Sequence, residues 1–309
     1  MHALTSLAQV PGGFSPTAVT IGKFDGIHLG HQKLIRALNA AAAEHALQSV
    51  LVTFDKHPDV LLNPHQAKLP LIGPHQKQAL VEQAQVDVML TLEFTADLAE
   101  LSATEFVQKI LVDGLNAKIV LVGEDFRFGH KGHGDIHVLH DLGQQLGFEV
   151  RVISAENLNH EKISSSRIRE YFDEGNVSAA AAMLGRNHTS VGLIEHGLKI
   201  GREIGFPTAN MARDCEGYLP LDGVYAGWLI ADDVKYPAAH SVGVNATFQE
   251  VPRLVESHVL DRNDLDLYDK KVTLEFVEFI RPAAKFNGAE DLVEEINRDL
   301  AKTRQILGI

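Results

Sequence analysis

The chain of 309 residues contains a single cysteine, Cys215, and this scarcity excludes several classes of protein. One thiol cannot form an intramolecular disulfide framework or a CxxC metal site, and it fits a reducing compartment. No apolar run approaches the roughly 18 residues that a membrane helix needs. The first residues, MHALTSLAQVPGGFS, lack the basic stretch and apolar core of a signal peptide. We therefore expect a cytoplasmic protein.

The chain also has fewer basic than acidic residues. Lys and Arg number 28 against 41 Asp and Glu, which gives a formal net charge of -13. This balance argues against nucleic acid or an anionic membrane as a partner. It leaves nucleotides open, because a local nest of backbone N–H groups can bind phosphate on an acidic protein. No GxxxxGK[ST] motif is present, so a P-loop is excluded.

The length predicts about two domains. Residues 17–184 alternate between apolar, strand-like runs and helical patterns, which predicts βαβ crossovers and a Rossmann-like parallel sheet. The strand-like runs are 18–22, 49–54, 87–92, 117–123 and 148–154. Polar clusters directly follow several of these runs, and ligands bind at the carboxyl ends of parallel strands. We expect a site there.

The pattern changes near residue 187. Short alternating runs separated by turn residues follow, which predicts a small antiparallel β-barrel or sandwich. The chain ends in an amphipathic helix whose apolar stripe includes Leu292, Ile296 and Leu300. We therefore expect domains at 1–186 and 187–309.

The first polar cluster is GKFDGIHLGH, residues 22–31. Its glycines allow tight turns, and a helix beginning near His28 would offer free N–H groups to phosphate. His28 and His31 are three residues apart, so both imidazoles face one point and suit the developing charge of a phosphoryl transfer. Two alternatives remain open: a strand–turn–helix with incidental histidines, and a pair of metal ligands without a matching third ligand.

A second cluster, ISSSRIREYF, begins at Ile163. Hydroxyls of Ser165 and Ser166 and the guanidinium of Arg169 at a helix entry can grip a polyphosphate. The alternative is an ordinary serine N-cap followed by a surface arginine.

Together, HxGH after the first strand and the Ser-rich loop after the last resemble the nucleotidylyltransferase superfamily. With LVTFDKHP and VGEDFRFGHKGHGD, they resemble the FMN adenylyltransferase module of prokaryotic bifunctional riboflavin kinase/FAD synthetases. The resemblance implies that His28 and His31 contact ATP and the transition state. It implies further ATP and phosphate contacts from Gly22, Phe24, Asp25, Gly30, Ser165, Ser166 and Arg169. It implies a flavin side formed by Phe54, Pro58, Asp125, Phe126 and Phe128. Lys23 departs from the usual family pattern before FDG.

Two features stand out in the C-terminal half. In GREIGFPTAN, Thr208 and Asn210 present oxygens on one side of an extended chain, and hard oxygens suit Mg²⁺. The alternative is a simple turn. In RLVESHVL, Glu256 lies on the strand face opposite Val255, where it suits a general base, or it is a plain solubility residue.

The order GREIGFPTANM, LPLDGVYAGWL, LVESHVLDRNDLDLY resembles the riboflavin kinase module, which follows the adenylyltransferase in the same enzymes. The resemblance implies a small barrel with a terminal helix, Mg²⁺–ATP at Thr208 and Asn210, and Glu256 as the base. It places Gly201 and Gly205 at ATP and Arg281 near the flavin. Val244, Ala246 and Asp269 depart from the family pattern.

We therefore expect an enzyme that phosphorylates riboflavin to FMN and adenylylates FMN to FAD. Its partners would be ATP, Mg²⁺ and the flavins, without nucleic acid or membrane. Two alternatives stay open: a flavin-sensing protein with a silenced kinase half, and an adenylyltransferase for another phosphate-bearing acceptor.

Overall fold

A computed structural model describes residues 1–196, 201, 205–243, 253–286 and 288–309. Contacts between residues divide the chain into two compact units. The N-terminal unit comprises residues 1–70 and 74–163, and the C-terminal unit comprises 71–73 and 164–309. Among the described residues, no helix is long and apolar enough to cross a membrane.

The N-terminal unit is built on a six-stranded sheet in which every neighbouring pair is parallel. Its strands, in the order β1-β4-β3-β2-β5-β6, are His2–Leu4, Val88–Leu92, Gln48–Phe54, Thr17–Ile21, Ala117–Gly123 and Glu149–Ile153. This arrangement confirms the expected parallel sheet. The sequence pattern missed β1, because three residues are too few to establish a strand period.

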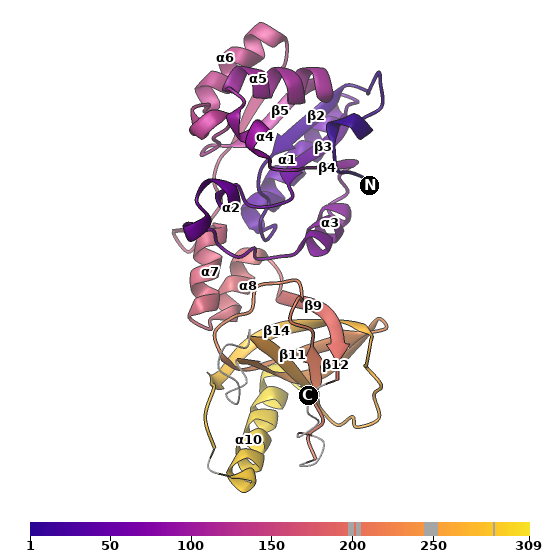
Figure 1. Cartoon of the computed structure of the whole chain (residues 1–309), viewed down its shortest axis with the longest axis vertical. Helices are drawn as coiled ribbons and strands as arrows, with labels where there is room; N and C mark the ends of the chain where they lie inside the picture. The colour runs from indigo at the N-terminus through magenta and orange to yellow at the C-terminus, as the bar shows by residue number, and fades with distance from the viewer. Residues whose placement is uncertain (197–200, 202–204, 244–252, 287) are drawn as a thin grey trace. The chain divides into compact units, whose positions relative to one another are not determined.

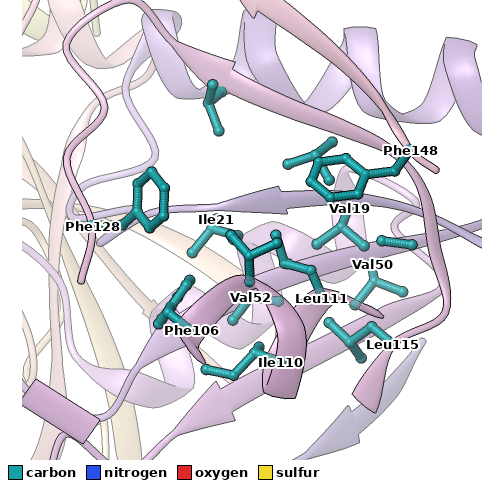
Figure 2. Close-up of a cluster of buried hydrophobic side chains, with 14 of the residues drawn as sticks. Val19, Ile21, Val50, Val52, Phe106, Ile110, Leu111, Leu115, Phe128 and Phe148 are labelled. Carbon is teal, nitrogen blue, oxygen red and sulfur yellow. The ribbon is translucent and has the colours of Figure 1, made fainter. Parts of the chain in front are cut away.

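Helices cover the sheet on both faces (Figure 1). Helix α1 (Leu29–Glu44) packs on β2, β3 and β5 through its apolar face. On the other face a core of Val, Ile and Leu side chains from the central strands meets Ile110, Leu111 and Leu115 (Figure 2). The other helical segments of this unit are η1 Leu7–Gln9, α2 Asp59–Leu62, η2 Pro64–Gln66, α3 Pro74–Gln83, α4 Ala96–Glu100, α5 Ala103–Phe106, η3 Val107–Gly114, η4 His130–Gly132 and α6 Ile136–Leu146. A short hairpin, β7 Asn157–Leu158 and β8 Glu161–Lys162, completes the unit.

The strand order reverses at β2. From β2 the chain builds β3 and β4 on one side, then crosses to β5 and β6 on the other. Ligands of open α/β sheets bind at the carboxyl ends of the strands beside such a reversal. The segments that follow β2 and β5 contain the GKFDGIHLGH and GEDFRFG clusters. The topology therefore puts the two clusters at the expected binding edge.

The C-terminal unit contains a closed six-stranded antiparallel barrel, as expected for this half. In the order β10-β13-β12-β11-β14-β9, its strands are Ala209–Met211, Leu254–Val259, Val234–Gly243, Gly223–Ala231, Lys271–Pro282 and His188–Glu195. The terminal helix α10 (Ala289–Leu307) packs against β11, β12 and β14 (Figure 1).

Two further helices, α7 (Ser165–Asp173) and α8 (Val177–Leu184), group with the barrel by their contacts. Helix α8 packs on β9 and β14. The Leu221 amide donates to the Phe172 carbonyl oxygen at 2.8 Å, and the Tyr218 hydroxyl donates to Asp173 at 2.6 Å. The division by contacts therefore falls between residues 163 and 164, upstream of the boundary expected from the sequence pattern.

Two candidate active sites

The loop after β2 leads directly into helix α1 and is conformationally strained. Phe24 and Ile27 have φ values of 47° and 42°, in the left-handed region that L-residues with side chains avoid. Helix α1 begins at Leu29, as the sequence predicts, and His28 caps it: its Nδ1 accepts the His31 amide at 3.3 Å. Both histidines are therefore held by the start of the helix.

The imidazole rings of His28 and His31 stack with centroids 3.7 Å apart and 15° between their planes. Burial, then the His28 ring and Lys77, lower the pKa of His31 well below its usual value. Its Nδ1 is buried without a hydrogen-bond partner among the described residues. Gly30 leaves room for this stack, since a Cβ there would lie 3.3 Å from the His28 ring. A neutral, unsatisfied imidazole at a helix N-terminus can hydrogen-bond a phosphate oxygen.

A cavity of about 560 Å³ lies at the carboxyl edge of the same sheet. It brings together all the side chains that the resemblance places on the flavin side: Phe54, Pro58, Asp125, Phe126 and Phe128. The rings of Phe126 and Phe128 stack at 5.4 Å. Gly22 and Lys23 also line the cavity, so the β2 loop forms part of its wall. The space is apolar, with polar groups at its edge, as in a site for a planar aromatic ligand.

Sequence reasoning missed several residues of this cavity. Phe94 packs edge-on against Phe54 at 5.5 Å, and Arg127 and Lys131 supply positive charge. Asp125 is exposed and pairs with Lys162. Phe94 follows strand β4, and this position at the end of a predicted strand could have indicated that it lines the site.

The Ser-rich segment differs from its expected local structure. Ser164 is the N-cap of α7, accepting the Arg167 amide at 3.2 Å, so Ser165 and Ser166 lie in the first helical turn and do not precede it. Arg169 is buried, and its Nη1 donates to the Ser165 carbonyl at 3.1 Å. These residues group with the barrel unit. Their expected action together with His28 and His31 stays a prediction.

A second cavity, of about 420 Å³, lies between the barrel and α10. Glu256, Thr208, Gly201 and Arg281 line it. Burial raises the pKa of Glu256, although a hydrogen bond from Thr208 (Oγ1 to Oε2, 3.4 Å) opposes the shift.

Strand β13 alternates as the sequence predicts: Val255, Ser257 and Val259 are buried. Glu256 is on the other face, which is half-buried beneath the cavity instead of open to solvent. Asn210 is the register partner of Glu256 in the β10–β13 pair, so the two side chains share a face. The Thr208 hydroxyl therefore contacts the Glu256 carboxylate, and Asn210 lies on the same strand face without being among the described residues that line the cavity.

His258 was missed by the sequence reasoning. Its Nδ1 lies 2.8 Å from the Pro207 carbonyl oxygen, and its ring contacts Phe206 at 5.6 Å. Since the carbonyl can only accept, Nδ1 carries the hydrogen and donates. Burial lowers the pKa of His258. Its position two residues after Glu256 puts both side chains on one strand face, and this spacing could have indicated that His258 lies beside Glu256.

The Arg281 fork is bound to α10. Its Nε and Nη2 donate to Asp299 at 3.0 and 2.8 Å, and Asp299 is almost fully buried. The guanidinium also lies over the Phe286 ring at 5.6 Å. The residue is on the cavity wall, as the resemblance implies, but its described hydrogen bonds tie the helix to the barrel.

The two glycines of the C-terminal motif differ. A Cβ at Gly201 would lie 2.4 Å from the Phe206 carbonyl oxygen, so this close approach requires glycine. Gly205 has a φ of 90° and is not among the described residues that line the cavity.

Of the departures from the family pattern, Asp269 has a φ of 58°, so it occupies the left-handed conformation that glycine would favour. Val244 and Ala246 lie outside the described residues. Lys23 is exposed at the rim of the larger cavity.

Comparisons with known proteins identify the family of each half. The model of the FAD synthetase family matches residues 13–167, and that of the riboflavin kinase family matches residues 184–307. A bifunctional riboflavin kinase/FMN adenylyltransferase from Listeria monocytogenes is 34% identical over 93% of this chain and 91% of its own length. The protein of that name from Escherichia coli K12 is 29% identical over 100% of this chain and 98% of its own. A crystal structure described as a macrolide-efflux protein from Streptococcus pneumoniae superposes with a TM-score of 0.88 at 32% identity, covering 98% of both chains.

Proposed function

The chain belongs to the family of bifunctional riboflavin kinase/FMN adenylyltransferases, and from this premise we propose how its two halves divide the chemistry. The chain is an enzyme of flavin-cofactor synthesis with ATP, riboflavin and FMN as substrates. Residues 1–186 carry adenylyl transfer and residues 187–309 carry phosphorylation. One observation supports this division above all: each half contains its own cavity, one walled in part by Gly22 and Lys23 of the loop that leads to His28 and the other lined by Glu256.

In adenylyl transfer, the phosphate of FMN attacks the α-phosphorus of ATP and pyrophosphate leaves. His28, His31 and the N-terminus of α1 stabilise the charge that develops on the phosphoryl oxygens, so no covalent intermediate is required. Gly22, Phe24, Asp25 and Gly30 shape the ATP side, and the Phe126 and Phe128 rings contact the flavin. Ser165, Ser166 and Arg169 hold the polyphosphate.

In the kinase half, Glu256 accepts the proton of the ribityl hydroxyl as that oxygen attacks the γ-phosphorus of ATP, and ADP leaves. A carboxylate whose pKa is raised by burial is a stronger base than an exposed one. Thr208 is hydrogen-bonded to Glu256, and Asn210 is paired with Glu256 across β10 and β13. Hydroxyl and amide oxygens are ligands that Mg²⁺ accepts, and we assign the metal to Thr208 and Asn210. Mg²⁺ bound there supplies positive charge for the ATP phosphates. Gly201 and Gly205 form the ATP loop, and Arg281 borders the flavin.

The cytoplasm is the proposed location, since the substrates are the common intracellular nucleotides and one thiol suits a reducing compartment.

The direct test is a chromatographic time course of the purified chain with riboflavin, ATP and Mg²⁺. We expect FMN to rise first and FAD to follow. If riboflavin stays unchanged while supplied FMN becomes FAD, the kinase half is silent and the flavin-sensing alternative gains support. If supplied FMN is untouched but another phosphate-bearing acceptor, such as phosphopantetheine, is adenylylated, the proposed acceptor is wrong.

A further inference from the structure

Lys77, on helix α3, places a half-buried ammonium group at the ends of strands β2 and β3. Its Nζ donates to the Lys23 carbonyl oxygen at 3.0 Å and to Thr53 Oγ1 at 3.4 Å. The Thr53 hydroxyl in turn donates to the same Lys23 carbonyl at 3.1 Å. The three groups form a closed triangle of hydrogen bonds around one carbonyl oxygen.

That carbonyl directly precedes the strained part of the loop. Phe24 has a φ of 47° and is fully buried, with its ring 5.1 Å from that of His31. A left-handed conformation is strained for a residue with a side chain and persists only where surrounding contacts fix it. The triangle supplies such a contact, so the Lys23 carbonyl sets the position of the Phe24 ring and, through it, of His31.

The charge of Lys77 has a second consequence. Burial lowers the pKa of Lys77, while the nearby Asp25 carboxylate raises it in opposition. The Lys77 charge adds to the burial and the His28 ring that lower the pKa of His31. Withdrawing an ammonium group from water even in part is costly, and such groups concentrate at functional sites.

We propose that Lys77 is a positioning residue for adenylyl transfer: its ammonium group fixes the Lys23 carbonyl and thereby holds Phe24 and His31 in their reactive arrangement. The inference rests on the proposed function of the N-terminal half. It adds a residue from α3, outside every motif that the sequence singled out.

The test compares Lys77→Met with Lys109→Met in the full chain. Lys109 is an exposed lysine of the same unit, paired only at 3.9 Å with Glu105 among the described groups, so it controls for the loss of one charge. Initial rates of FAD formation are measured with FMN and ATP varied, and riboflavin phosphorylation is measured on the same samples.

We expect Lys77→Met to lower kcat for FAD formation by about 10- to 100-fold, since small misplacements of reacting groups cost rates of this size. The KM for ATP should stay within about two-fold, because the residue acts through the loop and not on the bound nucleotide. Lys77→Arg, which keeps a donor for the Lys23 carbonyl, should recover part of the rate. Riboflavin phosphorylation should be unchanged, and an unchanged KM for ATP in FAD formation reports that the N-terminal unit has folded.

Two results would overturn the inference: an effect of Lys77→Met on kcat no larger than that of Lys109→Met, or a raised KM for ATP at unchanged kcat, which indicates direct phosphate binding.

Thr53→Val gives an independent check. Because both side chains act on one carbonyl, the Lys77→Met and Thr53→Val losses should be less than additive, and additive losses contradict the shared contact. If the unaltered chain forms no FAD from FMN, the proposed function itself fails. If it does, and His31→Ala lowers FAD formation while Lys77→Met keeps the rate of Lys109→Met, only the inference fails.

Discussion

The two sites of this chain are assembled in different ways. In the N-terminal unit, the reactive side chains lie within ten positions of sequence, on a strained loop and the first turn of α1. In the barrel, Thr208, Glu256 and Arg281 are far apart in sequence and meet because strands β10, β13 and β14 bring them to one cavity. The first site depends on local backbone conformation, whereas the second depends on strand register.

Burial also acts on different groups. In the N-terminal site it lowers the pKa of His31, which favours a neutral hydrogen-bonding ring. In the barrel it raises the pKa of Glu256, which favours proton capture. One site is therefore suited to stabilise phosphoryl charge and the other to take a proton, and variants that affect one reaction alone test this contrast.

Of these variants, Glu256→Gln should cause the largest difference between the loss of riboflavin phosphorylation and the loss of FAD formation. Removing the base leaves the shape of the cavity but no proton acceptor, so riboflavin phosphorylation should fall by about 10²- to 10⁴-fold. FAD formation from supplied FMN should be unchanged. Both rates are measured on one preparation, with Glu275→Gln on strand β14 as a control. An unchanged phosphorylation rate would exclude Glu256 as the base.

The next largest effect should be on stability. Asp299→Ala removes the partner of Arg281 and leaves a mostly buried guanidinium without its main ion pair. Breaking a buried pair costs about 3–5 kcal/mol. Urea unfolding followed by the fluorescence of Trp228, the single tryptophan and part of β11, reports on the barrel directly.

For Asp299→Ala we expect an earlier transition and a raised KM for riboflavin, with FAD formation retained at low denaturant. Asp291→Ala, at the exposed start of α10, is the matched control. Equal transitions for the two variants would show that the ion pair does not anchor the helix.

His31→Ala should have the opposite selectivity to Glu256→Gln, because it removes a side chain of the adenylyl-transfer site. Loss of a preorganised donor at a phosphoryl site costs about 10²- to 10³-fold, so FAD formation should fall while phosphorylation continues. The control is His140→Ala, an exposed histidine on α6. If both reactions slowed together, the two sites would be coupled, and their separation as drawn here would be wrong.

The contrast in assembly explains how much the sequence could predict. GKFDGIHLGH follows a buried strand, so the parallel sheet, the start of α1 and the pairing of His28 with His31 all follow from local pattern. The barrel was predictable from short alternating runs, and the face of Glu256 from the period of β13. Lys77 was not predictable, because it belongs to a polar helix whose packing onto the β2 and β3 ends is set by tertiary structure. The pairing of Arg281 with Asp299 joins a strand to a helix, and no spacing rule encodes it.

The smallest expected effect is on the pH dependence of stability, and it sharpens the same comparison. Burial lowers the pKa of His188 and His240, both in the barrel, to about 4. In the unfolded chain the pKa of histidine is about 6.5. Between these values the unfolded state binds more protons, so the stability of the barrel is complete above about pH 6.5 and falls as the pH drops toward 4.

Each of these histidines should cost up to about 3 kcal/mol at the acid end of this range, and about 1 kcal/mol near pH 5.5. The urea midpoint from Trp228 fluorescence, measured at pH 5.5 and 7.5, checks the sign. His240→Gln removes one titrating group and should flatten the slope, although it lowers the midpoint at both pH values because His240 bonds Ser257 at 3.0 Å. A slope as steep as that of the unaltered chain would mean that the acid sensitivity of the barrel arises from groups other than His240.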